Sequence, residues 1–127
     1  MTTLDDPNDQ TNHMIAARQV QGAKVFCTDL NEVGSIEDMM IDKASGRIAY
    51  AIVTTGGFLG MGETHYPLPW EKLRYDAEMG GYIVDVSQKM LEAGPSYSRG
   101  APSWNDEAWA RNIYTYYGVE PFWDTAS

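Results

Sequence analysis

Few residues in this chain have the chemistry of a catalytic or metal site, and its two histidines are the first to consider. No serine stands in a G-x-S-x-G nucleophile elbow that could use His13 or His65 as its base. His65 has no second ligand at metal-site spacing, so we expect a surface or hydrogen-bonded residue rather than a ligand or a base. Asp5, Asp6 and Asp9 lie near His13, but their spacing matches no standard site. The sequence therefore predicts no metal centre.

The single cysteine and the paired carboxylates also point away from catalysis. Cys27 has no histidine or basic residue adjacent to it, so we interpret it as a core residue rather than a nucleophile. Glu37 and Asp38 are neighbours, and adjacent residues on a strand point to opposite faces, so these carboxylates cannot jointly flank a substrate. Because catalysis needs titratable groups that converge in a pocket, we predict that the chain is not an enzyme and uses no cofactor.

A glycine-rich segment at 56–62, with the sequence GGFLGMG, is the remaining candidate. It lacks the lysine and the hydroxyl residue of a phosphate-binding loop, so it does not indicate a nucleotide site. Four glycines in seven residues predict a hairpin tip, and this tip carries Phe58, Leu59 and Met61. These apolar side chains can fold back over one end of the domain, or they can stand exposed for a partner.

Charge and composition limit the classes of partner and the cellular compartment that we expect for this chain. The net charge is −9, and the nine basic residues are scattered singly, which argues against binding to nucleic acid or anionic lipid. The N-terminal segment does not resemble a secretory signal, and no apolar run approaches the roughly 18 residues of a membrane helix. A lone cysteine suits a reducing compartment. We therefore expect an acidic cytoplasmic protein without direct membrane insertion.

Hydrophobic alternation predicts a mainly β domain. Strands are expected at residues 24–28, 33–42, 47–55, 64–70 and 82–86. Between the second and third of these, Asp42 can bond back to nearby backbone N–H groups and Gly46 accepts positive φ, so the loop is expected to be a tight hairpin. The strand at 47–55 is apolar on both faces, as expected for a strand covered on both sides.

The first strand of this hairpin is irregular. Ile36 is out of phase by one residue with Met39 and Ile41. A bulge near Glu37 and Asp38 would put all three apolar side chains inside. It would also bend the sheet, as a small barrel requires.

The strand at 64–70 is expected at an edge of the sheet. Pro67 and Pro69 alternate with Tyr66, Leu68 and Trp70, which we expect to point inward. Because proline cannot donate to a hydrogen-bonded ladder, these two prolines favour an edge or a bend over a central strand.

Two helices are expected after the last strand. Ser87 is an N-cap for a short helix that ends at Gly94 and Pro95. A final helix, at about 104–117, begins after Ser103 in a pattern that is similar to a capping box.

The end of the chain is crowded with aromatic residues. The apolar stripe of the final helix is expected to consist of Trp109, Ile113, Tyr116 and Tyr117, followed by Gly118 as a stop and by Phe122 and Trp123 in an aromatic tail. Tyrosine and tryptophan are favoured anchors of protein interfaces, so these side chains either pack within the chain or contact a partner.

Residues 22–86 resemble the PRC-barrel domain. The matching segments are GAKV at 22–25, VGSIED at 33–38, IDKASGRI at 41–48, PLPWE at 67–71 and YIVDV at 82–86. The resemblance implies a small β-barrel without catalytic residues that is used for contact with other proteins. We expect a disordered tail at 1–14, the PRC-barrel at 15–86, and a C-terminal helical extension at 87–127.

The predicted function is a non-enzymatic protein-binding or assembly module, an adaptor or scaffold that forms a homodimer. The interaction residues expected from the sequence are Phe58, Leu59, Met61, Trp109, Tyr116, Tyr117, Phe122 and Trp123. The alternative is a small-molecule sensor that binds an apolar ligand at the barrel end, under the loop at 56–62.

Overall fold

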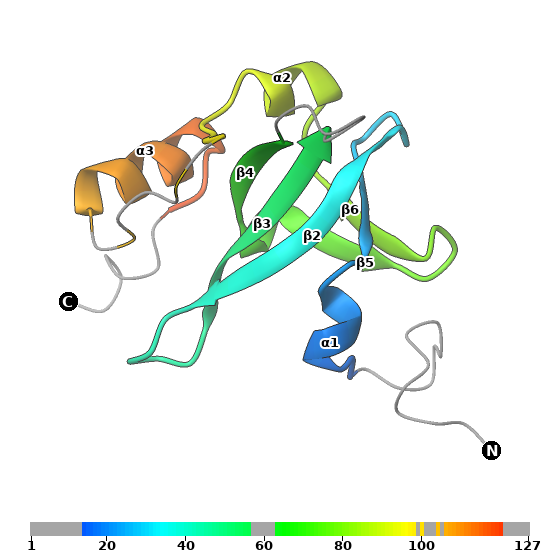
Figure 1. Ribbon diagram of the computed structural model, residues 1–127, viewed down its shortest axis with the longest axis horizontal. Coiled ribbons are helices and arrows are strands. Elements are labelled where there is room, and N and C mark those ends of the chain that lie inside the picture. The colour runs from blue at the N-terminus through cyan, green and yellow to red at the C-terminus, as the bar shows by residue number, and fades with distance from the viewer. Residues whose placement is uncertain (1–13, 57–62, 99, 101–103, 105, 121–127) are drawn as a thin grey trace.

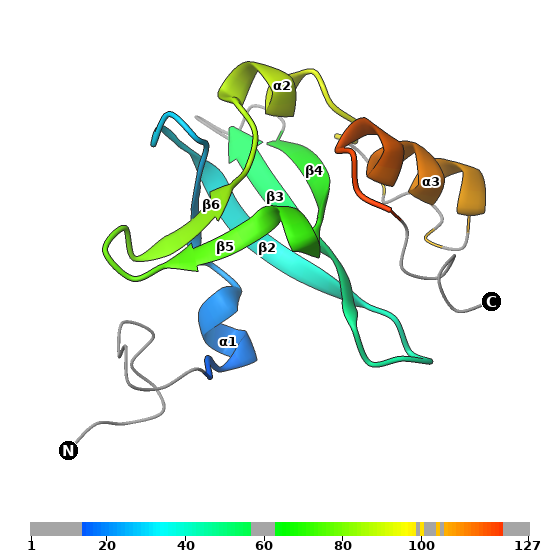
Figure 2. The same cartoon turned by 180° about the vertical axis from the view of Figure 1, so that it is seen from behind.

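The chain folds around one strongly twisted sheet of six strands, seen in the computed structural model (Figure 1), which describes residues 14–56, 63–98, 100, 104 and 106–120. The strands are β1 (Lys24–Phe26), β2 (Glu32–Ile41), β3 (Ile48–Gly56), β4 (Glu63–Pro69), β5 (Leu73–Asp76) and β6 (Gly81–Val84). Their order is β4-β3-β2-β1-β6-β5, with β1 and β6 parallel and the other neighbours antiparallel. Figure 2 shows the β5–β6 hairpin crossing β2.

The predicted mainly β fold is confirmed, and the sheet is not closed. Within the described chain, β4 and β5 are the two edge strands. The edge position that Pro67 and Pro69 predict for β4 is therefore confirmed. Between β4 and β5 the chain makes one turn of 3-10 helix, η2 (Trp70–Lys72), and Trp70 packs against Tyr82 with 5.5 Å between ring centroids.

The predicted hairpin between β2 and β3 is also confirmed. The carboxylate of Asp42 accepts hydrogen bonds from the backbone N–H of Ser45 at 2.9 Å and from its hydroxyl at 2.6 Å. Gly46 has a φ of +79°, a conformation that glycine adopts without steric cost. These contacts close the turn, and the hairpin projects from the rest of the sheet (Figure 1).

The bulge in β2 is confirmed, but its predicted consequence for Ile41 is wrong. The register shifts between Ile36 and Asp38, and Ile36 is fully buried while Met39 is half-buried. A second shift falls between Met40 and Ile41, where the extra residue is Ala49 on β3, and Ile41 is 58% exposed. Ile41 is the last residue of β2 and belongs to the part of the hairpin that projects from the rest of the sheet (Figure 1), so its side chain faces solvent.

In the described residues three α-helices flank the sheet: α1 (Ala17–Val20), α2 (Gln88–Glu92) and α3 (Glu107–Tyr116). The Ser87 cap of α2 is confirmed, since its hydroxyl accepts from the N–H of Met90 at 3.1 Å. The start predicted for α3 is wrong: the N-cap is Asp106, whose carboxylate accepts from the N–H groups of Ala108 and Trp109. Gly118, with φ of +69°, follows the helix as expected.

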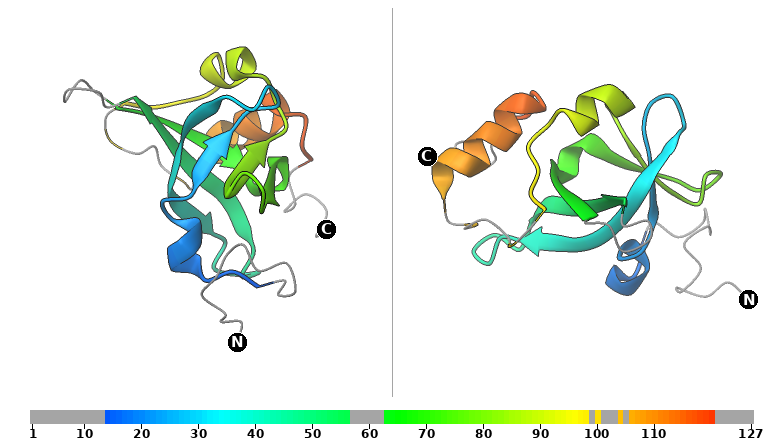
Figure 3. Two further views of the ribbon diagram at one scale, coloured as in Figure 1. Left: turned by 90° about the vertical axis from the view of Figure 1, so that its right-hand side faces the viewer. Right: turned by 45° about the horizontal axis from the view of Figure 1, so that its top comes forward.

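The buried face of α3 also differs from the predicted stripe. It consists of Ala110, Ile113 and Tyr114 and is continued by the C-cap residue Tyr117, at the i, i+3, i+4, i+7 spacing of one helix face. Trp109 and Tyr116 stand at the border of this face and are half-buried. Figure 3 shows α2 and α3 on the same side of the curved sheet.

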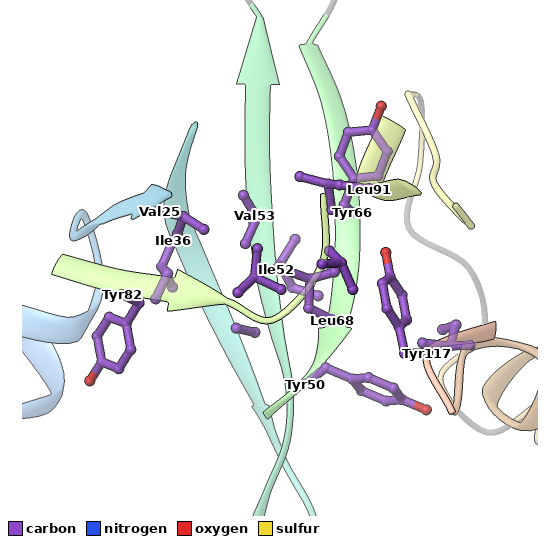
Figure 4. Packing of buried hydrophobic residues seen from close by; sticks show 14 of the residues in the cluster. Val25, Ile36, Tyr50, Ile52, Val53, Tyr66, Leu68, Tyr82, Leu91 and Tyr117 are labelled. Carbon is purple, nitrogen blue, oxygen red and sulfur yellow. The ribbon is translucent and has the colours of Figure 1, made fainter. Parts of the chain in front are cut away.

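A single apolar cluster fills the space between the sheet and these helices. Figure 4 shows part of it, including Val25, Ile52, Leu68, Leu91 and Tyr117. Cys27 belongs to this cluster and is fully buried, as predicted. No helix in the described part of the chain is long and apolar enough to cross a membrane. The tail predicted at 1–14 lies outside the described residues, apart from Met14.

Candidate functional site

An open groove of about 660 Å³ lies between the tip of the β2–β3 hairpin and the first turns of α3. It is lined by Met40, Ile41, Asp42, Lys43, Ala44, Ala49, Tyr50, Trp104, Glu107 and Ala110. Most of these side chains are apolar, and Ile41 stands 58% exposed at the hairpin. The groove is therefore an apolar surface that water reaches in this structure.

Small residues on both walls set the shape of the groove. Ala49 on β3 and Ala110 on α3 leave room for the two elements to approach closely. The hydroxyl of Tyr114 donates to the carbonyl oxygen of Ala49 at 2.9 Å and ties α3 to β3. The Tyr114 ring also meets the Tyr50 ring edge-on, with centroids 5.6 Å apart. These contacts fix the floor of the groove by packing within the chain.

Trp104 forms one end of the groove and contacts three other aromatic side chains. Its ring centroid lies 5.6 Å from that of Tyr50, 5.5 Å from that of Trp109 and 6.3 Å from that of Tyr97. Such edge-to-face and tilted pairs stabilise a particular arrangement of rings beyond the area that they bury. Trp104 is half-buried, so one part of it supports the groove and another part faces it.

The rim of the groove is predominantly acidic. Asp42 and Glu107 stand on opposite sides, and Lys43 is the cation among the lining residues. Hydrogen bonds from the hydroxyl and the backbone of Ser45 lower the pKa of Asp42 below its usual value, so this carboxyl stays ionised at neutral pH. Glu107 accepts from Arg111 at 3.0 Å on the outer face of α3. The groove therefore offers apolar area beside ionised carboxylates.

A separate polar cluster surrounds His65 on β4. The Nδ1 atom of His65 lies 2.8 Å from Oε1 of Glu37, which belongs to the β2 bulge, and 3.3 Å from the hydroxyl of Thr54 on β3. Glu63 completes the cluster, and one ligand-type atom of each of Glu37, Glu63 and His65 lies within 4.8 Å of the others. The prediction that His65 is a hydrogen-bonded residue is confirmed, but its partners Glu37 and Thr54 were not predicted.

These partners could not be predicted because they lie far from His65 in the sequence. Glu37 precedes His65 by 28 positions, and the two meet because β2, β3 and β4 pair in succession. Thr54 lies directly opposite His65 in the β3–β4 ladder. The predicted β2–β3 hairpin placed β2 beside β3, but the register with β4 depends on the glycine-rich connection and could not be read from the residues themselves.

The predicted interaction residues are divided by the structure. Phe58, Leu59, Met61, Phe122 and Trp123 lie outside the described residues. Tyr117 is only 2% exposed and packs inside the chain. Tyr116 is half-buried, and its hydroxyl donates to the carbonyl oxygen of Met90 at 2.6 Å. Trp109 is half-buried beside Trp104. Of the three that the structure describes, Trp109 contacts Trp104 at the end of the groove.

Cys27 is placed where a thiol reacts poorly. It is fully buried, and burial, with the nearby Asp29 and Glu92 carboxylates as smaller contributions, raises the pKa of the thiol to about 11. Because the thiolate is the reactive form, the protonated Cys27 thiol should react slowly at neutral pH.

The fold and the groove together define a small, twisted β domain with a helical extension along one side. A family model for the PRC-barrel domain matches residues 12–91, which is more than half of the chain. The chain therefore belongs to the PRC-barrel family. No curated protein matches it in sequence.

Proposed function

We propose that this chain is a non-enzymatic protein-binding module, an adaptor or scaffold, whose partner docks in the groove between the β2–β3 hairpin and α3. The groove itself is the observation that carries the proposal. Exposed apolar side chains beside tryptophan and tyrosine are typical of the centre of a protein interface, where a few anchors supply most of the binding energy. Ile41 is a large apolar side chain of the groove that is 58% exposed, so it is the first to be tested.

The charge of the rim specifies the chemistry of the partner. Asp42 and Glu107 border the apolar floor, and the whole chain has a net charge of −9. An apolar segment flanked by lysine or arginine residues would place its side chains on the floor and its charges beside these carboxylates. A second copy of this chain would bring another −9 to the contact, which disfavours it electrostatically.

Two other hypotheses from the sequence remain predictions. A homodimer is the other form that an assembly module can take, and the mass of the protein in solution distinguishes it. The sensor hypothesis places a ligand under the loop at 56–62. Most of that loop lies outside the described residues, and the groove lies at the opposite end of β3 from Gly56.

The experiment is a crosslinking pull-down of the tagged protein from its native host, with an amine-reactive crosslinker. Lys43 lines the groove, whereas Lys24, Lys72 and Lys89 do not. The expected result is a basic partner that crosslinks through Lys43 and is lost with Ile41→Gln. Leu30→Gln is the matched control, because Leu30 is 55% exposed but lies at the other end of β2, beyond its N-terminal residue.

The outcome also separates the competing forms. Crosslinks between copies of the chain, with a dimeric mass by light scattering, would replace the heterologous partner with a homodimer. A partner that crosslinks through the other lysines and survives Ile41→Gln would refute docking in the groove. Binding that weakens with added salt is expected, because the proposed contact includes charges at the rim.

A further inference from the structure

The polar cluster around His65 has the composition of a metal site, and no part of the proposed function uses it. Glu37, Glu63 and His65 offer two carboxylates and one imidazole from two strands, β2 and β4. Their ligand-type atoms lie within 4.8 Å of one another. This arrangement results from the bulge that turns Glu37 toward β4, so it is a product of the fold rather than of a sequence motif.

The distances suit a first-row divalent cation. Such an ion holds imidazole nitrogen and carboxylate oxygen at about 2.0–2.2 Å, so two of its ligands lie about 3–4 Å apart. The pair of His65 Nδ1 and Glu37 Oε1 is already 2.8 Å apart. Glu63 is exposed and can close the remaining gap by a small rotation about its side-chain bonds.

The imidazole is held in place before any ion arrives. The His65 ring stacks on the Tyr97 ring with centroids 5.0 Å apart and planes within 16°. The backbones of the two residues exchange hydrogen bonds of 2.8 and 3.0 Å. Thr54 donates from its hydroxyl to Oε1 of Glu37 at 3.1 Å, the kind of outer contact that orients a metal-ligating carboxylate.

We propose that Glu37, Glu63 and His65 bind a divalent transition-metal ion such as Zn²⁺. The ion takes the place of the proton between His65 Nδ1 and Glu37, and it relieves the repulsion between the two carboxylates. A mixed nitrogen and oxygen donor set favours zinc and its first-row neighbours over calcium and magnesium, which prefer oxygen ligands alone. With three ligands from the protein, the ion keeps at least one position for water or for a further ligand.

The test is isothermal titration calorimetry of the full chain, stripped of metal with a chelator, against ZnCl₂. One strong site per chain is expected, and His65→Ala and Glu63→Gln should each weaken it by at least about tenfold. Thr54→Val should weaken it by about tenfold or more through loss of the orienting hydrogen bond. Glu63→Gln keeps the test sound, because an exposed side chain can change without unfolding the protein.

The chain offers two matched controls. His13→Ala removes the only other histidine of the sequence. Asp38→Asn removes the carboxylate next to Glu37; the Asp38 side chain accepts a hydrogen bond from the N–H of Met39 and is not part of the His65 cluster. Both should leave Zn²⁺ affinity unchanged, and a shift of the ¹⁵N resonance of the His65 Nδ1 atom on titration should accompany binding. Absence of a strong site, loss of binding with His13→Ala, or unchanged affinity in both His65→Ala and Glu63→Gln would overturn the proposal.

Discussion

Tyr114 on α3 and Tyr117, the residue directly after the helix, are expected to respond to the same substitution with opposite changes in the free energy of unfolding. Tyr114 and Tyr117 are each only 2% exposed, and they lie on the same face of the helix. The hydroxyl of Tyr114 donates to the carbonyl oxygen of Ala49 at 2.9 Å. The hydroxyl of Tyr117 is buried without a hydrogen-bond partner among the described residues. Replacement of either residue by phenylalanine removes only that oxygen and preserves the ring.

The expected magnitudes follow from the fate of each hydroxyl. Tyr114→Phe leaves the buried carbonyl of Ala49 without this donor, and a buried group that loses its partner costs about 1–3 kcal/mol. Tyr117→Phe removes a hydroxyl whose burial without a hydrogen bond itself costs about 1–3 kcal/mol, so the variant should gain about 1 kcal/mol. The two variants should therefore differ in free energy of unfolding by at least about 2 kcal/mol.

The assay is urea unfolding at 25 °C and neutral pH, followed by far-ultraviolet circular dichroism. Equal m-values in both variants would show that the change lies in stability rather than in the compactness of either state. Destabilisation of Tyr117→Phe by more than about 1 kcal/mol would refute the reasoning, because it would mean that this hydroxyl has a partner such as an ordered water. A neutral Tyr114→Phe would show that the bond to Ala49 does not hold α3 on the sheet.

Three further predictions test the sheet, the hairpin and the core. Gly34→Ala should cost about 1–3 kcal/mol or more, because a Cβ there would overlap the backbone carbonyl of Thr54, and thermal unfolding measures the loss. Asp42→Asn should reduce stability at neutral pH and progressively less as the pH falls below 3.8: the folded pKa is lowered, so the contribution is complete above the unfolded value of 3.8 and is lost as pH falls through the folded pKa; melting of both proteins over a pH series checks this. Cys27 should resist an aromatic disulfide reagent at pH 8 until the protein unfolds, since its thiol is fully buried with a pKa of about 11; rapid labelling of the folded chain would contradict this.

Five of the six described strands could be predicted because their signals are local, whereas β5 (Leu73–Asp76) was not among the expected strands. Alternation, the two prolines of β4 and the Asp42–Gly46 turn each act within a few residues, and each prediction was confirmed. Ile41 was placed wrongly because alternation does not report where a hairpin leaves the core: Ile41 ends β2, and its side chain is 58% exposed. The second register shift, which adds Ala49 to β3 between the partners of Met40 and Ile41, was not predicted from the residues either.

The groove and the His65 cluster could not be predicted because they depend on contacts between residues far apart in the sequence. The predicted apolar face of α3 differs from the buried one because the prediction was based on the large apolar residues and left out Ala110. The small side chain of Ala110 lets the helix approach β3. The helix start was misplaced by three residues, since both Ser103 and Asp106 are good capping residues and only the fold selects between them. The Glu37–His65 pair required the register of three strands at once.

The groove is built by residues inside the family match and by residues beyond it. Residues 12–91 match the family and supply Met40, Ala49 and Tyr50, whereas Trp104 and Ala110 come from the segment beyond the match. Within the described chain, Tyr114 and Tyr50 pack together across this boundary, so the extension completes the core and builds one wall of the groove. If a partner docks in the groove as proposed, exposed residues of α3 can be substituted without changing the sheet, and such substitutions should alter partner choice more than fold stability.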